Sequence, residues 1–292
     1  MTIYPFKFAL GPLEITGYGI MLMVAFLTGG WLVTLELRRR GLAEDYAADM
    51  VAAAVIGGVI GAKLWYVALT RDPGALLSRG GLVWYGGFLG GTAAVILNGW
   101  RLRVPLRWTM QLVAPALAAA YALGRVGCFL VNDDYGRPSS LPWAVKFPQG
   151  LPPSTAGNMQ HLFGLPVPAG TDPSTVLAVH PTQLYEVALM LGAFFVLWVW
   201  RKRERPVGWL FGVYLVLAGV ERFLVEFLRA KDDRFLGPFT IAQATSVCLV
   251  AVGAYLLTAW KDEPDPDRPG KTRIVRSDFL EFSLKDGKAG RE

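Results

Sequence analysis

Residues 124–147 read GRVGCFLVNDDYGRPSSLPWAVKF, and the rest of the chain is best understood from this stretch. Arg125 stands near the end of an apolar run that begins at Trp108, so the sequence carries a guanidinium into or against a membrane. An arginine at the bilayer centre costs roughly 2.5 to 3.5 kcal/mol, and it usually faces a protein interior or a wet cavity that holds a partner. The run then enters residues 133–137, DDYGR, a turn crowded with charge. An anionic ligand at the membrane surface is the simplest reason to gather these groups.

The whole chain is too apolar for an ordinary water-soluble domain. It is 53% hydrophobic and only 18% charged, with a mean hydropathy of +0.37, which is typical of a polytopic membrane protein. Both cysteines, Cys128 and Cys248, lie within apolar runs, so we expect no disulfide. The start, MTIYPFKF, lacks a basic region before a short apolar core, and we therefore expect no cleaved signal peptide.

Nucleic acid and metal are both poor candidates for the ligand. The net charge of +6 comes from short basic clusters beside apolar runs, where membrane orientation explains them better than a nucleic-acid partner does. The two histidines, His161 and His180, are 19 residues apart and show no metal-ligand spacing. We therefore expect no nucleic-acid partner, no metal and no cofactor.

Seven segments are apolar and long enough to cross a bilayer, which requires about 20 residues of helix. The sequence thus predicts an all-α integral membrane protein with seven transmembrane helices within residues 15–260. The predicted spans are 15–35, 47–69, 80–100, 108–131, 183–200, 207–228 and 235–260.

Basic residues in the short loops predict how these spans are oriented. The clusters at 38–40, 101–107 and 201–205 fall on one face, which the positive-inside rule makes cytoplasmic. The N-terminus, with an interfacial segment over residues 1–14, is then outside, and the charged tail at 261–292 is cytoplasmic. The outer loop at 229–236 holds Arg229, Lys231 and Arg234 against this rule, so these cations require another explanation.

The connection between the fourth and fifth spans is too long for a simple turn. Leu141, Trp143, Val145 and Phe147 alternate as a short strand does. We expect a small extracytoplasmic cap at about 132–180 that covers the membrane mouth, with a disordered loop as the alternative.

Polar groups from several predicted spans converge at the depth of the outer leaflet. Arg222, Glu226 and Arg229 are spaced i, i+4 and i+7 and share one helical face. Because arginines outnumber the nearby carboxylates, we expect an anion between them, and a phospholipid headgroup is the anion available there. The alternative is structural: ion pairs across helices, an interfacial aromatic belt, and glycines that let helices approach. Other groups at this depth are Arg125, Tyr18, Tyr85, Gly86, Gly87, His180, Gln183, Tyr185 and Glu186.

Several ordered motifs resemble the prolipoprotein diacylglyceryl transferases of the bacterial inner membrane, over roughly residues 10–258. The order and spacing of the motifs carry the resemblance, since one alone would be weak. They are GPLEITGYGIML near the start, GAKLWYV, YGGFLGG, the stretch quoted above, HPTQLYE at 180–186, ERFLVEFLR at 221–229, and Gln243 after GPFTIA.

The resemblance implies an enzyme that moves the diacylglyceryl group of phosphatidylglycerol to the thiol of a lipobox cysteine and releases glycerol phosphate. The implied partners are phosphatidylglycerol, the signal peptides of prolipoproteins and membrane lipids. Arg125 and Arg222 would clamp the phosphate, with Tyr85 as the third catalytic position. The implied substrate-binding residues are Tyr18, Lys63, Gly86, Gly87, Asp133, Gly136, Arg137, His180, Gln183, Glu186, Glu226 and Arg229.

The chain departs from the family pattern at several of these positions. Tyr85 stands where a histidine base is usual, and a phenol with a pKa near 10 is a poor base unless cations lower it. Cys128, Lys63 and Ala218 replace an asparagine, an arginine and a tyrosine. His180 or Asp133 are alternative bases. The rival hypotheses are a divergent relative that lipidates another acceptor, and a non-catalytic protein that binds lipid or lipoprotein. A transporter is disfavoured because no repeated halves are visible.

Overall fold

The computed structural model describes residues 1–11, 13–77, 81–231, 234–236 and 239–260. It separates into two compact units. Of the described residues, 1–28, 114–203 and 209–260 form the first unit, and 29–113 and 204–208 form the second. The predicted cytoplasmic tail at 261–292 lies outside the described residues.

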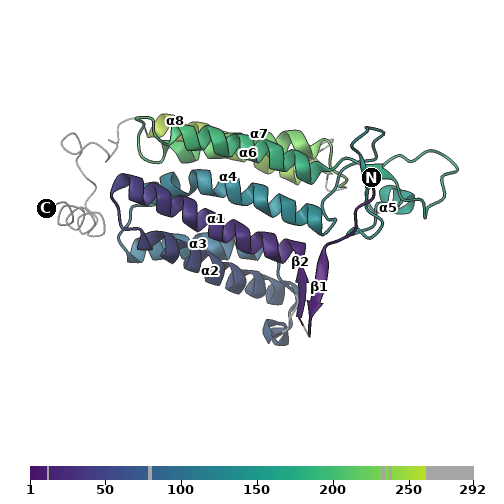
Figure 1. Ribbon diagram of the computed structural model, residues 1–292, viewed down its shortest axis with the longest axis horizontal. Coiled ribbons are helices and arrows are strands. Elements are labelled where there is room, and N and C mark those ends of the chain that lie inside the picture. The colour runs from purple at the N-terminus through teal and green to yellow at the C-terminus, as the bar shows by residue number, and fades with distance from the viewer. Residues whose placement is uncertain (12, 78–80, 232–233, 237–238, 261–292) are drawn as a thin grey trace. The chain divides into compact units, whose positions relative to one another are not determined.

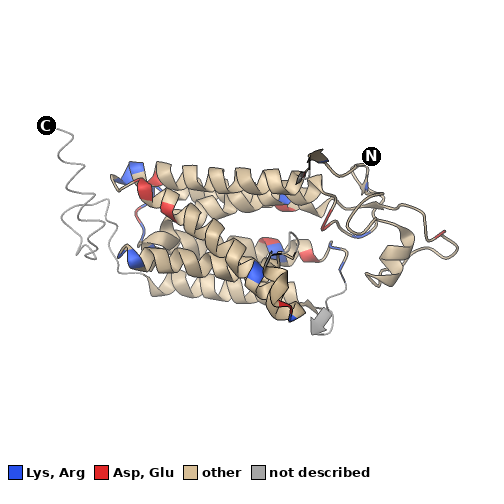
Figure 2. Ribbon diagram, turned by 90° about the horizontal axis from the view of Figure 1, so that it is seen from below, with Lys and Arg blue, Asp and Glu red and all other residues tan. Residues whose placement is uncertain are grey.

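Long helices account for most of the described chain, as the hydropathy predicted. They are α1 (Gly17–Arg40), α2 (Asp45–Thr70), α3 (Trp84–Arg101), α4 (Leu106–Leu130), α6 (Thr182–Trp200), α7 (Trp209–Glu226) and α8 (Ile241–Ala259). Figure 2 shows long stretches of these helices without charge and blue and red positions mainly near their ends.

Five helices within the described residues are long and apolar enough to cross a membrane, namely α1, α2, α4, α6 and α8. This confirms a multi-pass membrane protein. The helix α7 carries Glu221, Arg222 and Glu226 within its 18 residues, which is more charge than most spans hold. The number of seven spans and their orientation stay predictions.

The last predicted span begins later than expected. Residues Arg234–Leu236 (β5) and Phe239–Thr240 (β6) form an antiparallel pair before α8, so the helix starts at Ile241 rather than at residue 235. A capping box fixes this start, because the Thr240 side chain accepts from the backbone of Gln243 while the Gln243 side chain accepts from the backbone of Thr240.

Small residues let the helices of the first unit pack closely. Ala114, Ala118 and Ala122 lie one turn apart on α4 and are buried in a cluster with side chains of α6 and α7. Between α7 and α8, a Cβ added at Gly219 would lie 2.8 Å from the carbonyl oxygen of Ser246. Figure 1 accordingly shows α6, α7 and α8 side by side.

The chain before α1 contains two antiparallel strands, and its place at the membrane interface stays a prediction. Strand β1 (Lys7–Leu10) pairs antiparallel with β2 (Leu13–Thr16), which includes the start predicted for the first span. The backbone N–H of Phe6 donates to the carbonyl of Leu130 at 2.7 Å, so this segment is tied to the end of α4.

The long connection after α4 has a folded core of its own. Strand β3 (Val145–Lys146) pairs with β4 (Ala178–Val179), and the short helix α5 (Ala156–His161) contributes Met159. Phe147 is fully buried and stacks on Tyr135. The strand predicted over residues 141–147 is only two residues long, because Leu141 and Trp143 are exposed and unpaired with β4.

Glycines hold α2 and α3 together in the second unit. A Cβ at Gly86 would lie 2.3 Å from the carbonyl oxygen of Gly61, and one at Gly90 would lie 2.4 Å from that of Gly57. Only glycine permits such backbone approach, which is typical of helix contacts in membranes. Elsewhere in this unit, buried Glu36 pairs with Arg39 and Arg40 near the end of α1.

Candidate functional site

The ends of three helices and the turn after α4 place the charged groups of the first unit. Arg125 lies in the last turns of α4, Glu186 in the second turn of α6, and Arg222 near the end of α7. After α4 the chain adopts positive φ at Asn132 (60°) and Asp134 (64°), a conformation that asparagine and aspartate tolerate better than most residues. This turn brings the carboxylate of Asp134 back to Arg125.

Glu186 is the centre of the cluster and has no exposed surface. Its Oε2 lies 2.8 Å from Nε of Arg125, and its Oε1 lies 3.3 Å from Nη1 of Arg222 and 3.6 Å from Nη1 of Arg229. Guanidinium groups from α4, α7 and the segment after α7 therefore meet at one buried carboxylate.

Asp134 forms a second bridge on the other side of Arg125. Its Oδ2 lies 2.8 Å from Nη1 of Arg125, while its Oδ1 pairs closely with Nη2 of Arg229 and lies 3.8 Å from Nζ of Lys231. Burial raises the pKa of the Asp134 carboxyl, but the charges of Arg229 and Arg125 more than offset this and hold that pKa well below its usual range. Asp134 is therefore ionised at neutral pH.

Among the described residues, the ion-pair network joins four cations to three carboxylates. Glu226 completes it, with an oxygen 2.8 Å from Nη2 of Arg222. The cations are Arg125, Arg222, Arg229 and Lys231, and the carboxylates are Asp134, Glu186 and Glu226. The excess of cations predicted from the sequence is thus a single charge within this network, and each arginine already has carboxylate partners.

Burial distinguishes the three arginines. The side chain of Arg229 is 2% exposed, whereas those of Arg125 and Arg222 are 16% and 19% exposed. The two arginines that were predicted to be catalytic are thus the two that retain exposed surface.

Gln183 and Asp133 make hydrogen bonds that stabilise the turn after α4. Gln183 is fully buried, and its Nε2 donates to the carbonyl of Asp133 at 2.6 Å. The Asp133 side chain accepts from the backbone N–H of Asp134 at 2.7 Å. Burial and the nearby charge of Asp134 raise the pKa of Asp133.

Gly136, Arg137 and His180 lie where the turn meets the segments before α6 and after α7. A Cβ at Gly136 would lie 2.5 Å from the carbonyl oxygen of Leu228, so the close approach there is to the protein's own backbone. Arg137 donates to the carbonyl of Arg229 at 3.3 Å. Nδ1 of His180 lies 3.2 Å from the Tyr185 hydroxyl, and burial lowers the pKa of His180.

Tyr18 and Cys128 flank Arg125 within the first unit. Tyr18 opens α1 and packs against α4, where a Cβ at Gly127 would lie 3.2 Å from its Cα. The Cys128 sulfur accepts a weak contact from Nη1 of Arg125 at 3.7 Å.

The remaining predicted positions belong to the second unit. Tyr85 is 60% exposed in the first turn of α3, where its ring meets Trp84 edge to face. Gly86 packs against α2, whereas a Cβ at Gly87 would make only ordinary contacts, 3.5 Å or more away. Lys63 lies on α2.

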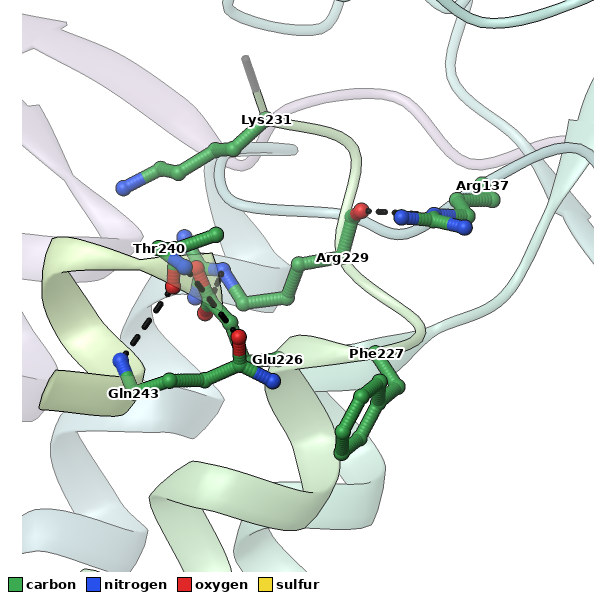
Figure 3. Close-up of a pocket in the computed structure, with 7 residues that line it drawn as sticks. All are labelled: Arg137, Glu226, Phe227, Arg229, Lys231, Thr240 and Gln243. Carbon is green, nitrogen blue, oxygen red and sulfur yellow. Dashed lines mark hydrogen bonds and ion pairs between the residues drawn. The ribbon is translucent and has the colours of Figure 1, made fainter. Parts of the chain in front are cut away.

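A polar pocket adjoins the arginine cluster (Figure 3). It is small, with a cavity volume of about 30 Å³. Its lining residues are Arg137, Glu226, Phe227, Arg229, Lys231, Thr240 and Gln243.

Sequence reasoning missed two residues of this region. Asp134 was passed over in favour of its neighbour Asp133, because only the backbone conformation of the turn decides which carboxylate faces Arg125. Lys231 had a signal, since it lies in the basic outer loop that runs against the positive-inside rule.

Comparison with known proteins assigns the chain to a family. Residues 5–259 match the family model described as prolipoprotein diacylglyceryl transferase. Three relatives carry the name phosphatidylglycerol–prolipoprotein diacylglyceryl transferase. The one from Clostridium tetani is 32% identical over 86% of this chain and 96% of its own length. Those from Nitratidesulfovibrio vulgaris and Cupriavidus metallidurans are 30% and 32% identical over 89% and 87% of this chain, and 96% and 92% of their own lengths. With its helices, its charged cluster and a family match over nearly its whole length, this chain belongs to the prolipoprotein diacylglyceryl transferase family and is a transferase.

Proposed function

We propose that this enzyme transfers the diacylglyceryl group of phosphatidylglycerol to the thiol of the lipobox cysteine in a prolipoprotein and releases glycerol phosphate. The observation that carries the proposal is the convergence of Arg125 and Arg222, from different helices, on the two oxygens of Glu186.

Arg125 and Arg222 bind the phosphate in this proposal. Both retain exposed surface, and Arg222 pairs with Glu186 through Nη1 and with Glu226 through Nη2. Arginine pairs with phosphate through two parallel hydrogen bonds, which a lysine cannot do.

Glu186 and Glu226 hold the two arginines in position. A buried carboxylate between guanidinium groups fixes their geometry before the lipid arrives, so little reorganisation is needed during the reaction. The other residues proposed to bind substrate in the first unit are Tyr18, Asp133, Gly136, Arg137, His180, Gln183 and Arg229, and Lys63, Gly86 and Gly87 stay predicted substrate-binding positions.

The chemistry places charge on the departing phosphate. The sulfur attacks the carbon of the diacylglyceryl group that bears the phosphate ester, and a C–S bond forms. The C–O bond between this carbon and the phosphate breaks, and its electron pair leaves with glycerol phosphate. Donors fixed beside the growing charge lower the barrier, and removing one such donor typically costs about 10²- to 10³-fold in rate.

The thiol proton requires an acceptor. His180 supports this role because burial lowers its pKa, which keeps its imidazole neutral at neutral pH. Asp133 is the alternative, since burial raises its pKa toward neutral pH. Tyr85 stands at the position of the usual histidine. A free thiol is already a few per cent ionised at neutral pH, so the base adds rate but is not indispensable.

The enzyme is proposed to act in the bacterial inner membrane. Seven spans, with the N-terminus outside and the tail in the cytoplasm, would place the cluster in the outer leaflet. There it meets membrane phospholipid and the signal peptide of an exported prolipoprotein.

A transfer assay tests the proposal. The purified protein in detergent with phosphatidylglycerol and a lipobox peptide should yield diacylglyceryl peptide and an equal amount of glycerol phosphate. The same peptide with serine in place of its cysteine should yield neither. Product formation that does not depend on the cysteine, or none while another family member is active in parallel, would refute the proposed reaction.

A second candidate is transfer of the same lipid to another acceptor, which Tyr85 and Cys128 favour because they depart from the family pattern. Mass spectrometry of lipidated products, in cells whose other family members have been deleted, separates the two. Lipidated lipobox cysteines support the first candidate and any other acceptor the second.

A further inference from the structure

Two linked hydrogen bonds outside the arginine cluster end on His180. Nε1 of Trp143 donates to the Tyr185 hydroxyl at 2.7 Å, and this hydroxyl lies 3.2 Å from Nδ1 of His180. The rings of His180 and Tyr185 meet edge to face, with their centres 6.0 Å apart. Trp143 lies in the connection between α4 and α6, and Tyr185 lies in the first turn of α6, so two separate segments hold this imidazole.

The backbone of His180 is bound to the turn that carries Asp134. Its carbonyl accepts from the backbone N–H of Gly136 at 2.9 Å, and its own N–H donates to the carbonyl of Arg137 at 3.0 Å. These bonds fix where the residue lies but do not use its side chain. The orientation of the ring therefore needs another contact, and Tyr185 supplies one.

The contact with Tyr185 bears on which ring nitrogen of His180 holds the proton. An indole nitrogen only donates, so the Tyr185 oxygen accepts at its contact with Trp143. A neutral imidazole carries one proton, and the partner of one nitrogen decides where that proton resides. His180 accepts a proton at Nε2 only when its own proton is on Nδ1, and this Nδ1–H requires an acceptor. The second lone pair of the Tyr185 oxygen is within its reach.

We infer that Tyr185, held by Trp143, is a positioning residue that keeps the proton of His180 on Nδ1 and leaves Nε2 to accept the thiol proton. The inference rests on the proposed function and adds Tyr185 and Trp143 to it. In the transfer step the S–H bond breaks and its proton passes to Nε2 while the sulfur forms the C–S bond. The electron pair of the broken C–O bond leaves with glycerol phosphate. The imidazolium donates from Nδ1 to Tyr185 and later releases the new proton to water.

The same contacts favour His180 over Asp133 as the base. The Asp133 side chain already accepts from the backbone N–H of Asp134 at 2.7 Å. Protonation of this carboxylate would weaken that bond, since a charged acceptor binds more strongly than a neutral one. Protonation of Nε2 has the opposite effect, because it strengthens the bond that Nδ1–H donates to Tyr185.

Nitrogen NMR of the full chain in detergent tests the arrangement without any need for activity. The sequence contains only two histidines, and the exposed His161 on α5 is the internal reference. With isotope-labelled histidine at about pH 8, where a neutral ring is expected, His180 should carry its proton on Nδ1. Tyr185→Phe should shift the His180 resonances toward the Nε2–H form and leave those of His161 unchanged. A wild-type His180 in the Nε2–H form, or resonances that ignore Tyr185→Phe, would overturn the inference.

Double variants separate positioning from a purely structural role. Tyr185→Phe should lower kcat about five- to tenfold, as for one hydrogen bond, and leave the KM for phosphatidylglycerol unchanged. In a His180→Ala background it should have no further effect, because no ring is left to position. Trp143→Phe should lower kcat about threefold, since it acts through Tyr185, and should also have no effect without His180. Equal losses in both backgrounds would mean that the contact only fastens the connection to α6, and would overturn the inference.

Matched controls remove the same atoms elsewhere in the chain. Tyr255→Phe on α8 and Trp100→Phe on α3 change side chains that are 67% and 80% exposed. Both should keep the wild-type kcat and the wild-type resonances of His180. A loss as large as that of Tyr185→Phe in either control would count against a specific role for Tyr185.

The two measurements keep this inference apart from the proposed function. Lipid transfer at the wild-type rate in Tyr185→Phe would refute the positioning role and leave the transferase. The expected His180 resonances, together with no transfer to a lipobox peptide, would refute the reaction and the base role while the arrangement of the ring stands.

Discussion

Nε of Arg125 lies 2.8 Å from Oε2 of Glu186, and this carboxylate has no exposed surface. The pair joins α4 to α6, and Arg222 on α7 contacts the other oxygen of the same carboxylate. A buried charge held between guanidinium groups is costly to leave unpaired, so Glu186 fixes the positions of both arginines.

Glu186→Gln should destabilise the protein strongly, because the isosteric amide removes the charge shared by Arg125 and Arg222. Breaking a buried pair from one side costs about 3–5 kcal/mol. The matched control is Glu14→Gln. The side chains of Glu14 and Lys7 are more than half exposed, so loss of their ion pair should change stability little. Thermal unfolding in detergent measures both, and equal shifts for the two variants would contradict the central place of Glu186.

Asp134→Asn should destabilise the protein, whereas Asp133→Asn, at the adjacent position, should not. Asp134 is ion-paired with Arg125 and Arg229, so its loss should cost at least about 2 kcal/mol at pH 7. Burial and the charge of Asp134 disfavour the ionised form of Asp133, so Asp133→Asn should leave stability unchanged or raise it.

The pH dependence of these variants follows from the direction of each pKa. Because the folded state lowers the pKa of Asp134, its contribution is complete above about pH 4, the usual pKa in an unfolded chain, and is lost as pH falls further. The difference in unfolding temperature between wild type and Asp134→Asn should therefore shrink below pH 4. A constant difference down to pH 2.5 would show that charge is not the cause.

Gly90→Ala should destabilise the contact between α2 and α3, whereas Gly87→Ala should be tolerated. A methyl at Gly90 would lie 2.4 Å from the Gly57 carbonyl oxygen, while one at Gly87 would lie 3.5 Å from that of Gly58. Overpacking of this kind costs about 1–3 kcal/mol. Unfolding of both variants in detergent provides the comparison, and similar stability would argue against close backbone packing here.

Ser154→Ala should loosen the segment between α4 and α6. The buried Ser154 hydroxyl accepts from the backbone N–H of Phe147 and donates to the carbonyl of Leu177, each at 3.0 Å. Leaving these backbone groups unpaired costs about 1–3 kcal/mol. Limited proteolysis should cut this segment faster in Ser154→Ala than in Ser139→Ala, which loses one exposed contact. Equal cleavage rates would refute this role for Ser154.

Hydropathy predicted most helices to within a few residues, and the exceptions have local causes. Thr240 and Gln243 form a capping-box pattern, which predicts that α8 starts at Ile241. The apolar run from residue 235 favours an earlier start, and the span predicted from hydropathy therefore begins too early. Residues 141–147 alternate as a strand, yet only Val145 and Lys146 find a partner strand. Pairing depends on β4, about thirty residues further on, which no local pattern identifies.

The arginine cluster was predictable where it depends on a single helix. The spacing of Arg222, Glu226 and Arg229 predicts one shared helical face, and Arg222 and Glu226 do pair within α7. The helix ends at Glu226, however, so Arg229 reaches Glu226 from the segment that follows and not from the same helix. The choice between Asp133 and Asp134 was not predictable, because it depends on the positive φ of Asp134. The close contacts of Gly86 were likewise not predictable, because they are with Gly61 and Trp65 on α2 and depend on how the two helices pack.

The rate of glycerol phosphate release in arginine-to-lysine variants tests the account most directly. Lysine keeps the charge but loses two-point binding of phosphate, so Arg125→Lys and Arg222→Lys should each lower the rate about 100-fold or more. Arg38→Lys, which changes an exposed arginine that is ion-paired with Glu44 outside the cluster, should leave the rate unchanged. Rates in the Arg125 and Arg222 variants within about threefold of this control would contradict the claim that the two side chains bind the departing phosphate.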